Sequence, residues 1–352
     1  MPRLRTICLV VLAGLLALGV SGCKRSASRP KTLNVFNWSD YIDPELIKEF
    51  ESKHGCKVQY DTYSADADLE NKLASGAEYD VVFPSDRSLA PLLKRGLLQK
   101  LDRSKLSNLG NLNPASLGVR HDPRNEYTLP YFEGTLAVGI RTDRVTKPVK
   151  GFEILFDEEL KGKIVLLDDA EHVVAMALLH LGRDMNSVAD DDLAAARDLL
   201  QKQRPLVQAW SSDGFKDKLI KGEAWAALGW SGDLLQARDQ LAETGKGSIA
   251  VVVPASGTLR WVDSMAIPTA AKNVELAHAF IDFLLDPAVA ARNAAKVRYA
   301  TPNKAAFQRL DESLKKDPVV YPPAEIMHKC GYLKDRGKDI KKIEEVWKAV
   351  RH

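Results

Sequence analysis

Aromatic and acidic side chains recur together in short polar clusters along this sequence. The clusters are NWSDY from Asn37, PSDR from Pro84, LLDDAEH from Leu166, GWSGD from Gly229 and RWVDS from Arg260. An aromatic face that is shielded from water attracts an organic cation by up to about 2 kcal/mol. Hydrogen bonds between a carboxylate and a cationic donor are roughly twice as strong as neutral ones. Together these residue types indicate a site for an organic amine.

The clusters supply a candidate set of aromatic and carboxylate side chains. Its members are Trp38, Tyr41, Trp230, Trp261, Asp40, Asp169, Glu171, Asp233 and Asp263. Taken one at a time, a tryptophan after a strand more often belongs to the core. An aspartate there more often caps a helix, and Asp43 and Asp233 both precede expected helices. Because the whole set falls at successive strand ends, we interpret it as the lining of a ligand cleft.

The same clusters do not match the motifs of common hydrolases or nucleotide-binding enzymes. A nucleophile elbow reads Gly-x-Ser-x-Gly, but here Gly232 follows Ser231 directly. The sequence has no glycine-rich phosphate loop. Asp168 and Asp169 are neighbours at a strand end, so their side chains point apart and are poorly placed for acid–base catalysis. We therefore predict a binding protein, not an enzyme, that needs no cofactor. An exported α/β hydrolase is the less favoured alternative.

Short apolar strands alternate with amphipathic helices from Thr32 onward. Strands are expected at 33–36, 58–60, 80–83, 130–140, 163–167, 206–210, 224–228, 249–253 and 261–267. Helices are expected from 44, around 69–73, before Gly96, and at 172–181, 191–203, 215–221, 234–242, 274–285 and 340–350. This rhythm is typical of an α/β fold with a mostly parallel sheet. Two such lobes would enclose a cleft, where small ligands bind.

We interpret the first residues as an export signal that is not part of the folded protein. A basic start precedes an apolar run at 7–20, and a lipobox-like Val-Ser-Gly-Cys sequence follows. The run is shorter than the roughly 20 residues that span a bilayer. We predict a signal peptide at 1–22, lipidation of Cys23 and a flexible tether at 23–30. The alternative is ordinary cleavage after Gly22 with an incidental cysteine. A lipid anchor would hold the protein at a membrane without spanning it.

The composition is that of an ordinary globular protein of about two domains. Of the 352 residues, 45% are apolar and 28% are charged, and the net charge is +3. This near-neutral balance argues against nucleic acid as a partner. Cys56 and Cys330 remain in an exported, disulfide-permissive chain, and the sequence leaves their pairing open. His54 near Cys56 gives one ligand pair at most, so no metal site is expected.

The sequence resembles a known family, the periplasmic spermidine/putrescine-binding proteins of ABC transporters. The resemblance begins at about Thr32, continues to the YPPAE segment, and is carried in order by NVFNWSDYI, YDVVFPS, LPYFEGTLAVGI, LGWSGD, WVDSMAIP and YATPNKAA. It implies an α/β, two-lobed type II periplasmic-binding-protein fold with a ligand cleft between the lobes. Lobe 1 would comprise 31–137 plus about 264–306, and lobe 2 about 138–263 plus 307–352.

The resemblance also implies which residues line the ligand cleft. They are Trp38, Ser39, Asp40, Tyr41, Ser85, Trp230, Asp233, Trp261, Asp263 and Tyr299. Asp263 is expected to hold an ammonium group, and the tryptophans would enclose the methylene chain. Glu171 or Glu133 would serve the other end of the ligand.

Three positions depart from the family's pattern. His172 stands where the family usually has an acidic residue, with Glu171 one residue earlier, and Glu133 replaces a tryptophan. Arg87 is unfavourable beside a cation site unless it is paired. Glu133 or Asp86 could neutralise it, it could bind a ligand carboxylate, or it could point into solvent. His172, Arg87 and Glu133 therefore remain candidate ligand-binding residues.

These features predict an extracytoplasmic solute-binding protein of the periplasm. It would capture a polyamine of the putrescine/spermidine class between its lobes, favour the closed state, and deliver the ligand to an ABC permease in the inner membrane. The alternative ligand is another cationic or zwitterionic amine, such as a basic amino-acid derivative. The lipid anchor would be the protein's link to the membrane.

Overall fold

The computed structural model describes residues 31–118 and 121–351. The predicted signal peptide, Cys23 and the tether lie outside these residues. In the described part of the chain, no helix is long and apolar enough to cross a membrane, and no cluster of His, Cys, Asp and Glu could hold a metal ion. Cys56 is buried, Cys330 is partly buried, and both are free thiols. The disulfide that the sequence left open is therefore not formed.

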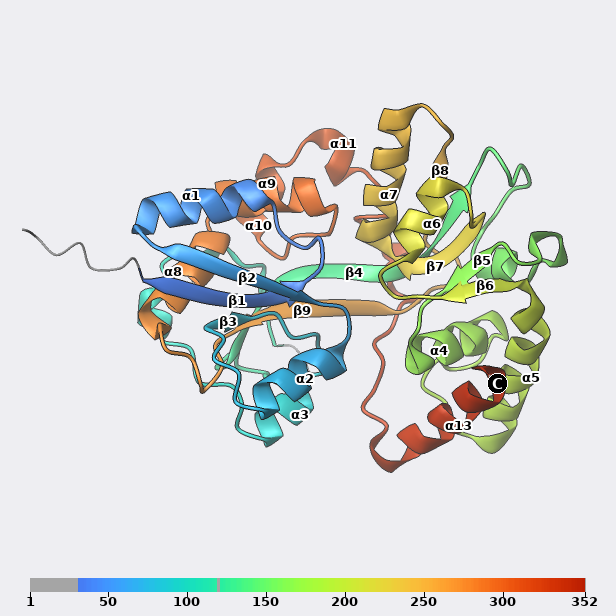
Figure 1. Cartoon of the computed structure of the whole chain (residues 1–352), viewed down its shortest axis with the longest axis horizontal. Coiled ribbons are helices and arrows are strands. Elements are labelled where there is room, and N and C mark those ends of the chain that lie inside the picture. The colour runs from blue at the N-terminus through green and yellow to red at the C-terminus, as the bar shows by residue number, and fades with distance from the viewer. Residues whose placement is uncertain (1–30, 119–120, 352) are drawn as a thin grey trace, which may run out of the picture. The chain divides into compact units, whose positions relative to one another are not determined.

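The first half of the sheet is parallel, and helices cover both of its faces (Figure 1). Its elements are β1 (Thr32–Trp38), α1 (Pro44–His54), β2 (Lys57–Tyr63), α2 (Asp66–Ala74), β3 (Val81–Val82) and α3 (Leu89–Lys94). β1 lies between β2 and β3 and runs parallel to both. Successive side chains of a strand point to opposite faces. Val35 therefore belongs to the core that includes Phe50 of α1, and Phe36 to the core that includes Leu69 of α2.

A second group of strands and helices follows the same plan. Its elements are β5 (Ile164–Leu166), α4 (Ala170–His180), α5 (Asp190–Gln203), β6 (Val207–Trp210), α6 (Phe215–Lys221), β7 (Ala226–Trp230), α7 (Ser231–Thr244) and β8 (Ile249–Val252). β5 runs parallel to both β6 and β7. The last helix, α13 (Ile340–Arg351), packs against α4 and α5 (Figure 1).

Two antiparallel strands join these groups. β4 (Thr128–Arg141) pairs through its first half with β9 (Arg260–Ala266) and through its second half with β7 and β8. Among the described residues the strand order is β2-β1-β3-β9-β4-β7-β5-β6, with β8 beside β4. The sheet is therefore mixed and not mostly parallel as expected, because β4 and β9 run against their neighbours. The lobe boundaries stay a prediction.

Side-chain caps explain where several helices begin. Asp43 accepts a hydrogen bond from the Glu45 amide at 3.1 Å and caps α1, which confirms its predicted capping role. Asp233 is not a cap, because α7 begins two residues earlier at Ser231. The helix α9 (Pro287–Val297) was not predicted from the sequence. It directly follows α8 (Val274–Leu284). The chain also forms the short helices α10 (Lys304–Arg309), α11 (Glu312–Lys315) and α12 (Ala324–Met327).

Candidate functional site

A narrow cavity lies where the ends of several strands meet. Its volume is about 130 Å³, which is below the roughly 300 Å³ at which pockets for drug-sized ligands begin. Seven of the described residues that line it are aspartates: Asp66, Asp86, Asp168, Asp169, Asp213, Asp233 and Asp263. Among the same described residues, Arg87 is the single arginine. This lining suits a slim ligand that carries positive charge.

The Asp263 carboxylate on β9 is buried without a cationic partner. The residue is 7% exposed, and the Tyr41 hydroxyl donates a hydrogen bond of 2.8 Å to its Oδ2. Within residues 31–118 and 121–351, no lysine, arginine or histidine forms an ion pair with it. Burial raises the pKa of Asp263 well above its usual value, and the nearby Asp66 and Asp86 raise it further. A bound cation would favour the ionised carboxylate.

Asp233, in the first turn of α7, shares a lysine with Asp40. Nζ of Lys216 on α6 lies 3.5 Å from the Asp233 carboxylate and 2.8 Å from that of Asp40. Burial raises the pKa of Asp233 to about 6, although Lys216 acts to lower it. The Asp233 amide donates a hydrogen bond of 3.2 Å to the Tyr299 hydroxyl. This contact links the start of α7 to the aromatic wall of the cavity.

Aromatic rings form the apolar wall. The Trp261 ring is edge-on to Trp230, with centroids 6.2 Å apart, and lies 5.0 Å from the ring of Tyr299. Gly134 on β4 leaves room for this arrangement, because an added Cβ would come within 2.3 Å of the Trp261 ring. Trp38 donates its indole N–H to the backbone carbonyl after β3 at 2.9 Å, which fixes its orientation. Such rings pack against methylene groups and attract cations.

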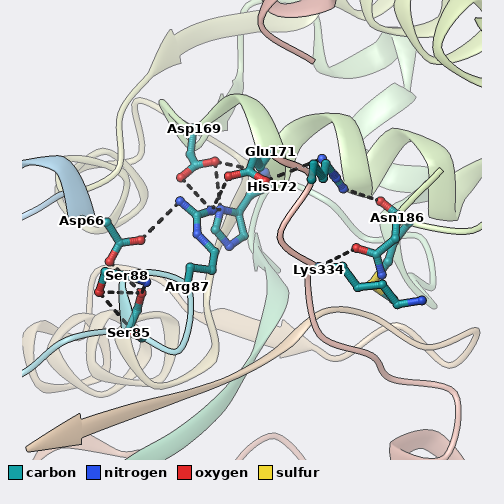
Figure 2. Close-up of polar contacts among 11 residues, drawn as sticks. Asp66, Ser85, Arg87, Ser88, Asp169, Glu171, His172, Asn186 and Lys334 are labelled. Carbon is teal, nitrogen blue, oxygen red and sulfur yellow. Dashed lines mark hydrogen bonds and ion pairs between the residues drawn. The ribbon is translucent and has the colours of Figure 1, made fainter. Parts of the chain in front are cut away.

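Arg87 is held by three carboxylates and one imidazole (Figure 2). We call the five residues Arg87, Asp66, Asp169, Glu171 and His172 the arginine cluster. The Arg87 guanidinium lies 3.2 Å from Asp66, 3.4 Å from Asp169 and 3.6 Å from Glu171. Nδ1 of His172 lies 3.1 Å from the same guanidinium. Burial acts to lower the pKa of Arg87, but the three carboxylates raise it, so the group stays cationic. Burial acts to raise the pKa of Asp169, yet His172 and Arg87 hold it well below its usual value.

Most of the chain matches known binding proteins. The family described as bacterial extracellular solute-binding protein matches residues 45–322. The spermidine/putrescine-binding periplasmic protein of Escherichia coli (strain K12) is 36% identical over 345 residues, which cover 97% of each protein. The chain belongs to the bacterial extracellular solute-binding proteins.

Solved structures of relatives share the fold of this solute-binding protein. The spermidine/putrescine ABC transporter substrate-binding protein PotD of Streptococcus pneumoniae aligns with a TM-score of 0.80 at 32% identity, covering 91% of this chain and 98% of that one. The TpPotD lipoprotein of Treponema pallidum aligns with a TM-score of 0.79 at 28% identity, covering 91% and 99%. The predicted fold class is thereby confirmed.

Most residues predicted for the ligand site line the cavity of this solute-binding protein. They are Trp38, Ser39, Tyr41, Ser85, Arg87, His172, Trp230, Asp233, Trp261, Asp263 and Tyr299. Those at the ends of β1, β3, β5 and β7 meet because the carboxyl ends of parallel strands gather at one edge of a sheet. Trp261 and Asp263 reach the same place from inside the antiparallel strand β9, and Tyr299 from the segment after α9. Their contact with a ligand stays a prediction.

Asp40 and Glu171 were predicted to bind the ligand but lie outside the cavity lining. Asp40 has a left-handed φ of 53°, and its side chain is 68% exposed and bonded to Lys216. Glu171 lies 3.6 Å from Arg87 and 3.7 Å from Arg336, so two arginines engage its carboxylate. Both acids are therefore already paired with cations of the protein.

Glu133 also lies outside this cavity, because of side-chain alternation on β4. Glu133 is in register with Val262, and Phe132 with Asp263. Neighbouring side chains on a strand point to opposite faces, so Asp263 faces the cavity and Glu133 lines hollows elsewhere. The expectation that Glu133 neutralises Arg87 is wrong. Carboxylates of the arginine cluster take that role, and Asp86 also raises the pKa of Arg87.

Some lining residues of this solute-binding protein were not named from the sequence. They are Tyr63, Ser64, Ala65, Asp66, Ser212 and Asp213. The first four extend from the last residue of β2 to the first residue of α2, and the last two follow β6. The rule that ligand loops follow strands could have found them. The segment after β6 combines Trp210 with Asp213, and the segment after β2 combines Tyr63 with Asp66, as the chosen clusters combine such residues.

Proposed function

We propose that this solute-binding protein captures a polyamine of the putrescine/spermidine class in the cavity around Asp263. The observation that carries this proposal is the buried Asp263 carboxylate, which has no cationic partner in the described residues. An ammonium group would supply the missing charge to a carboxylate that Tyr41 already orients. Trp230 and Trp261 would pack along the methylene chain. The spermidine and putrescine in the relatives' names support the same ligand class.

A zwitterionic ligand is less well supported. Its carboxylate would need an available cation, and Arg87 was the candidate. The Arg87 guanidinium is already engaged by three carboxylates of the protein. The hydrolase alternative also lacks support, because Ser231 is buried and its hydroxyl accepts a hydrogen bond from the Thr135 amide at 3.3 Å. Binding without turnover is the activity that we propose.

We further propose that the protein delivers its ligand to an ABC permease while a lipid on Cys23 holds it at a membrane of the cell envelope. Delivery is supported by the relatives, which include a periplasmic binding protein and an ABC transporter substrate-binding protein. The anchor is supported by the Val-Ser-Gly-Cys sequence and by the relative named a lipoprotein.

Thermal unfolding of the purified protein with a panel of compounds tests the ligand class. We expect at least one of putrescine, cadaverine and spermidine to raise the melting temperature, and neutral diols and dicarboxylates to have no effect. A ligand at a hundred times its dissociation constant adds about 2.7 kcal/mol to the free energy of unfolding. Arginine and a carboxylated amine test the zwitterionic alternative. A response to those compounds but to none of the polyamines would contradict the proposal.

A further inference from the structure

We propose that Arg87 is a specificity-determining residue that restricts the cavity to short diamines, such as putrescine, and disfavours longer triamines, such as spermidine. This inference rests on the proposed function and adds a preference within that ligand class. Its basis is the arginine cluster, in which the Arg87 guanidinium already forms ion pairs with carboxylates that line the ligand cavity (Figure 2).

The carboxylates of the arginine cluster that line the cavity are already engaged. In Asp66, Oδ1 accepts a hydrogen bond from the Ser85 hydroxyl at 2.7 Å, and Oδ2 lies 3.2 Å from Arg87. In Asp169, Oδ1 accepts a hydrogen bond from the His172 amide at 3.1 Å, and Oδ2 lies 3.4 Å from Arg87. A ligand ammonium that bound these oxygens would have to lie beside the Arg87 guanidinium or displace it.

A second arginine balances part of the charge of the cluster. Arg336 lies 3.7 Å from Glu171, and its side chain is 2% exposed. Glu171, Asp66 and Asp169 therefore face two guanidinium groups, so two of the three negative charges are balanced without any ligand. An additional ammonium group beside Arg87 would meet a like charge in a partly buried site, where repulsion is stronger than in water.

Five lining aspartates lie outside the arginine cluster, and two of them are left for a diamine. Asp168 pairs with Arg351, Asp86 lies near Arg87, and Asp213 lies near Lys216. Asp263 has no cationic partner among the described residues. Asp233 shares Lys216 with the exposed Asp40, and Lys216 keeps its 2.8 Å contact with Asp40 if a ligand takes Asp233. These two carboxylates can serve two ammonium groups, whereas a third group would have to enter the cluster that Arg87 already fills.

Calorimetric titration with putrescine and spermidine tests this inference on the purified wild-type protein, Arg87→Ser and Arg87→Lys. We expect the wild type to bind putrescine at least tenfold more tightly than spermidine. Arg87→Ser exposes Asp66 and Asp169 to the ligand, so the affinity ratio should shift at least tenfold toward spermidine. Arg87→Lys keeps the positive charge and should keep the wild-type preference.

Arg292→Ser is the matched control, because it removes a half-exposed arginine of α9 that pairs with Glu49 on α1 at 2.6 Å. It should leave both affinities unchanged. If Arg87→Ser does not fold, as judged by circular dichroism, Arg87→Gln removes the charge while keeping most of the volume and should shift the ratio in the same direction.

The inference is overturned if the wild type binds spermidine as tightly as putrescine, or if the affinity ratio stays unchanged in the neutral Arg87 variant that folds. If neither neutral variant folds, the ratio of putrescine affinity to spermidine affinity in the wild type decides whether the inference holds. A wild-type protein that binds neither of these amines nor cadaverine would instead contradict the proposed function, so the two failures are distinguishable.

Discussion

An Asp263→Asn variant is expected to lose amine binding and yet to unfold at a higher temperature than the wild type when no ligand is present. Removing one partner of a buried charge pair costs about 2–5 kcal/mol, so the affinity should fall about 30-fold or more. The stability gain has a separate cause. Asparagine can still accept the Tyr41 hydrogen bond, but it carries no charge, and burial penalises ionised Asp263, whose pKa is raised.

Titration calorimetry with putrescine and thermal unfolding of the ligand-free protein measure these two effects. Asp217→Asn is the matched control, because this side chain on α6 is 71% exposed and pairs with Lys221 at 3.5 Å. The control should bind and unfold like the wild type. Normal putrescine binding by Asp263→Asn would show that the proposed ammonium site is wrong. Loss of binding together with loss of stability would indicate a structural role for Asp263.

Amine affinity is expected to fall as the pH drops below about 6, because Asp233 becomes protonated in this range. Burial raises the pKa of Asp233 to about 6, Lys216 acts to lower it, and Asp40 and Asp213 raise it. An alkyl ammonium group has a pKa near about 10 and stays charged in this range. Once Asp233 is protonated it no longer attracts the ligand, so affinity should approach a tenfold loss for each pH unit.

The stability of the ligand-free protein should respond to pH in the opposite direction. Folding raises the pKa of Asp233 from 3.8 to about 6, so the folded state binds more protons between these values. The stabilisation from this group is complete below the lower value and is lost as the pH rises through the higher one. Titrations and melting curves from about pH 5 to 8 measure both trends. Asp233→Asn should make both trends less steep, and a wild-type affinity that is constant over this range would contradict the assignment.

Residues of the cavity could be predicted from the sequence where they lie at the end of an expected strand or directly after it. Trp38, Trp230 and Asp233 follow from the rule that loops at the carboxyl ends of strands gather at one edge. The partners of Arg87 could not be predicted in this way. Its contact with Asp169 joins positions 82 residues apart and depends on how the two groups of elements pack against each other.

Two other differences have local causes that a short motif does not reveal. Asp40 adopts a positive φ, which directs a carboxylate from the most distinctive motif away from the cavity. The helix α9 was missed because Pro287 closely follows the helix expected at 274–285, and a proline at that place is usually a stop signal. Proline also fits the first turn of a helix, where its missing N–H is not needed, and Asp286 caps that turn by accepting hydrogen bonds from the Ala288 and Val289 amides.

A crystal structure of the protein with putrescine bound tests most directly whether an ammonium group meets Asp263 between the tryptophan rings. We predict an amine nitrogen within about 3 Å of an Asp263 carboxylate oxygen, with the methylene chain against Trp230 and Trp261. Arg87 should remain bonded to Asp66. Putrescine bound at another place, or in this cavity without contact to Asp263, would contradict the proposed site.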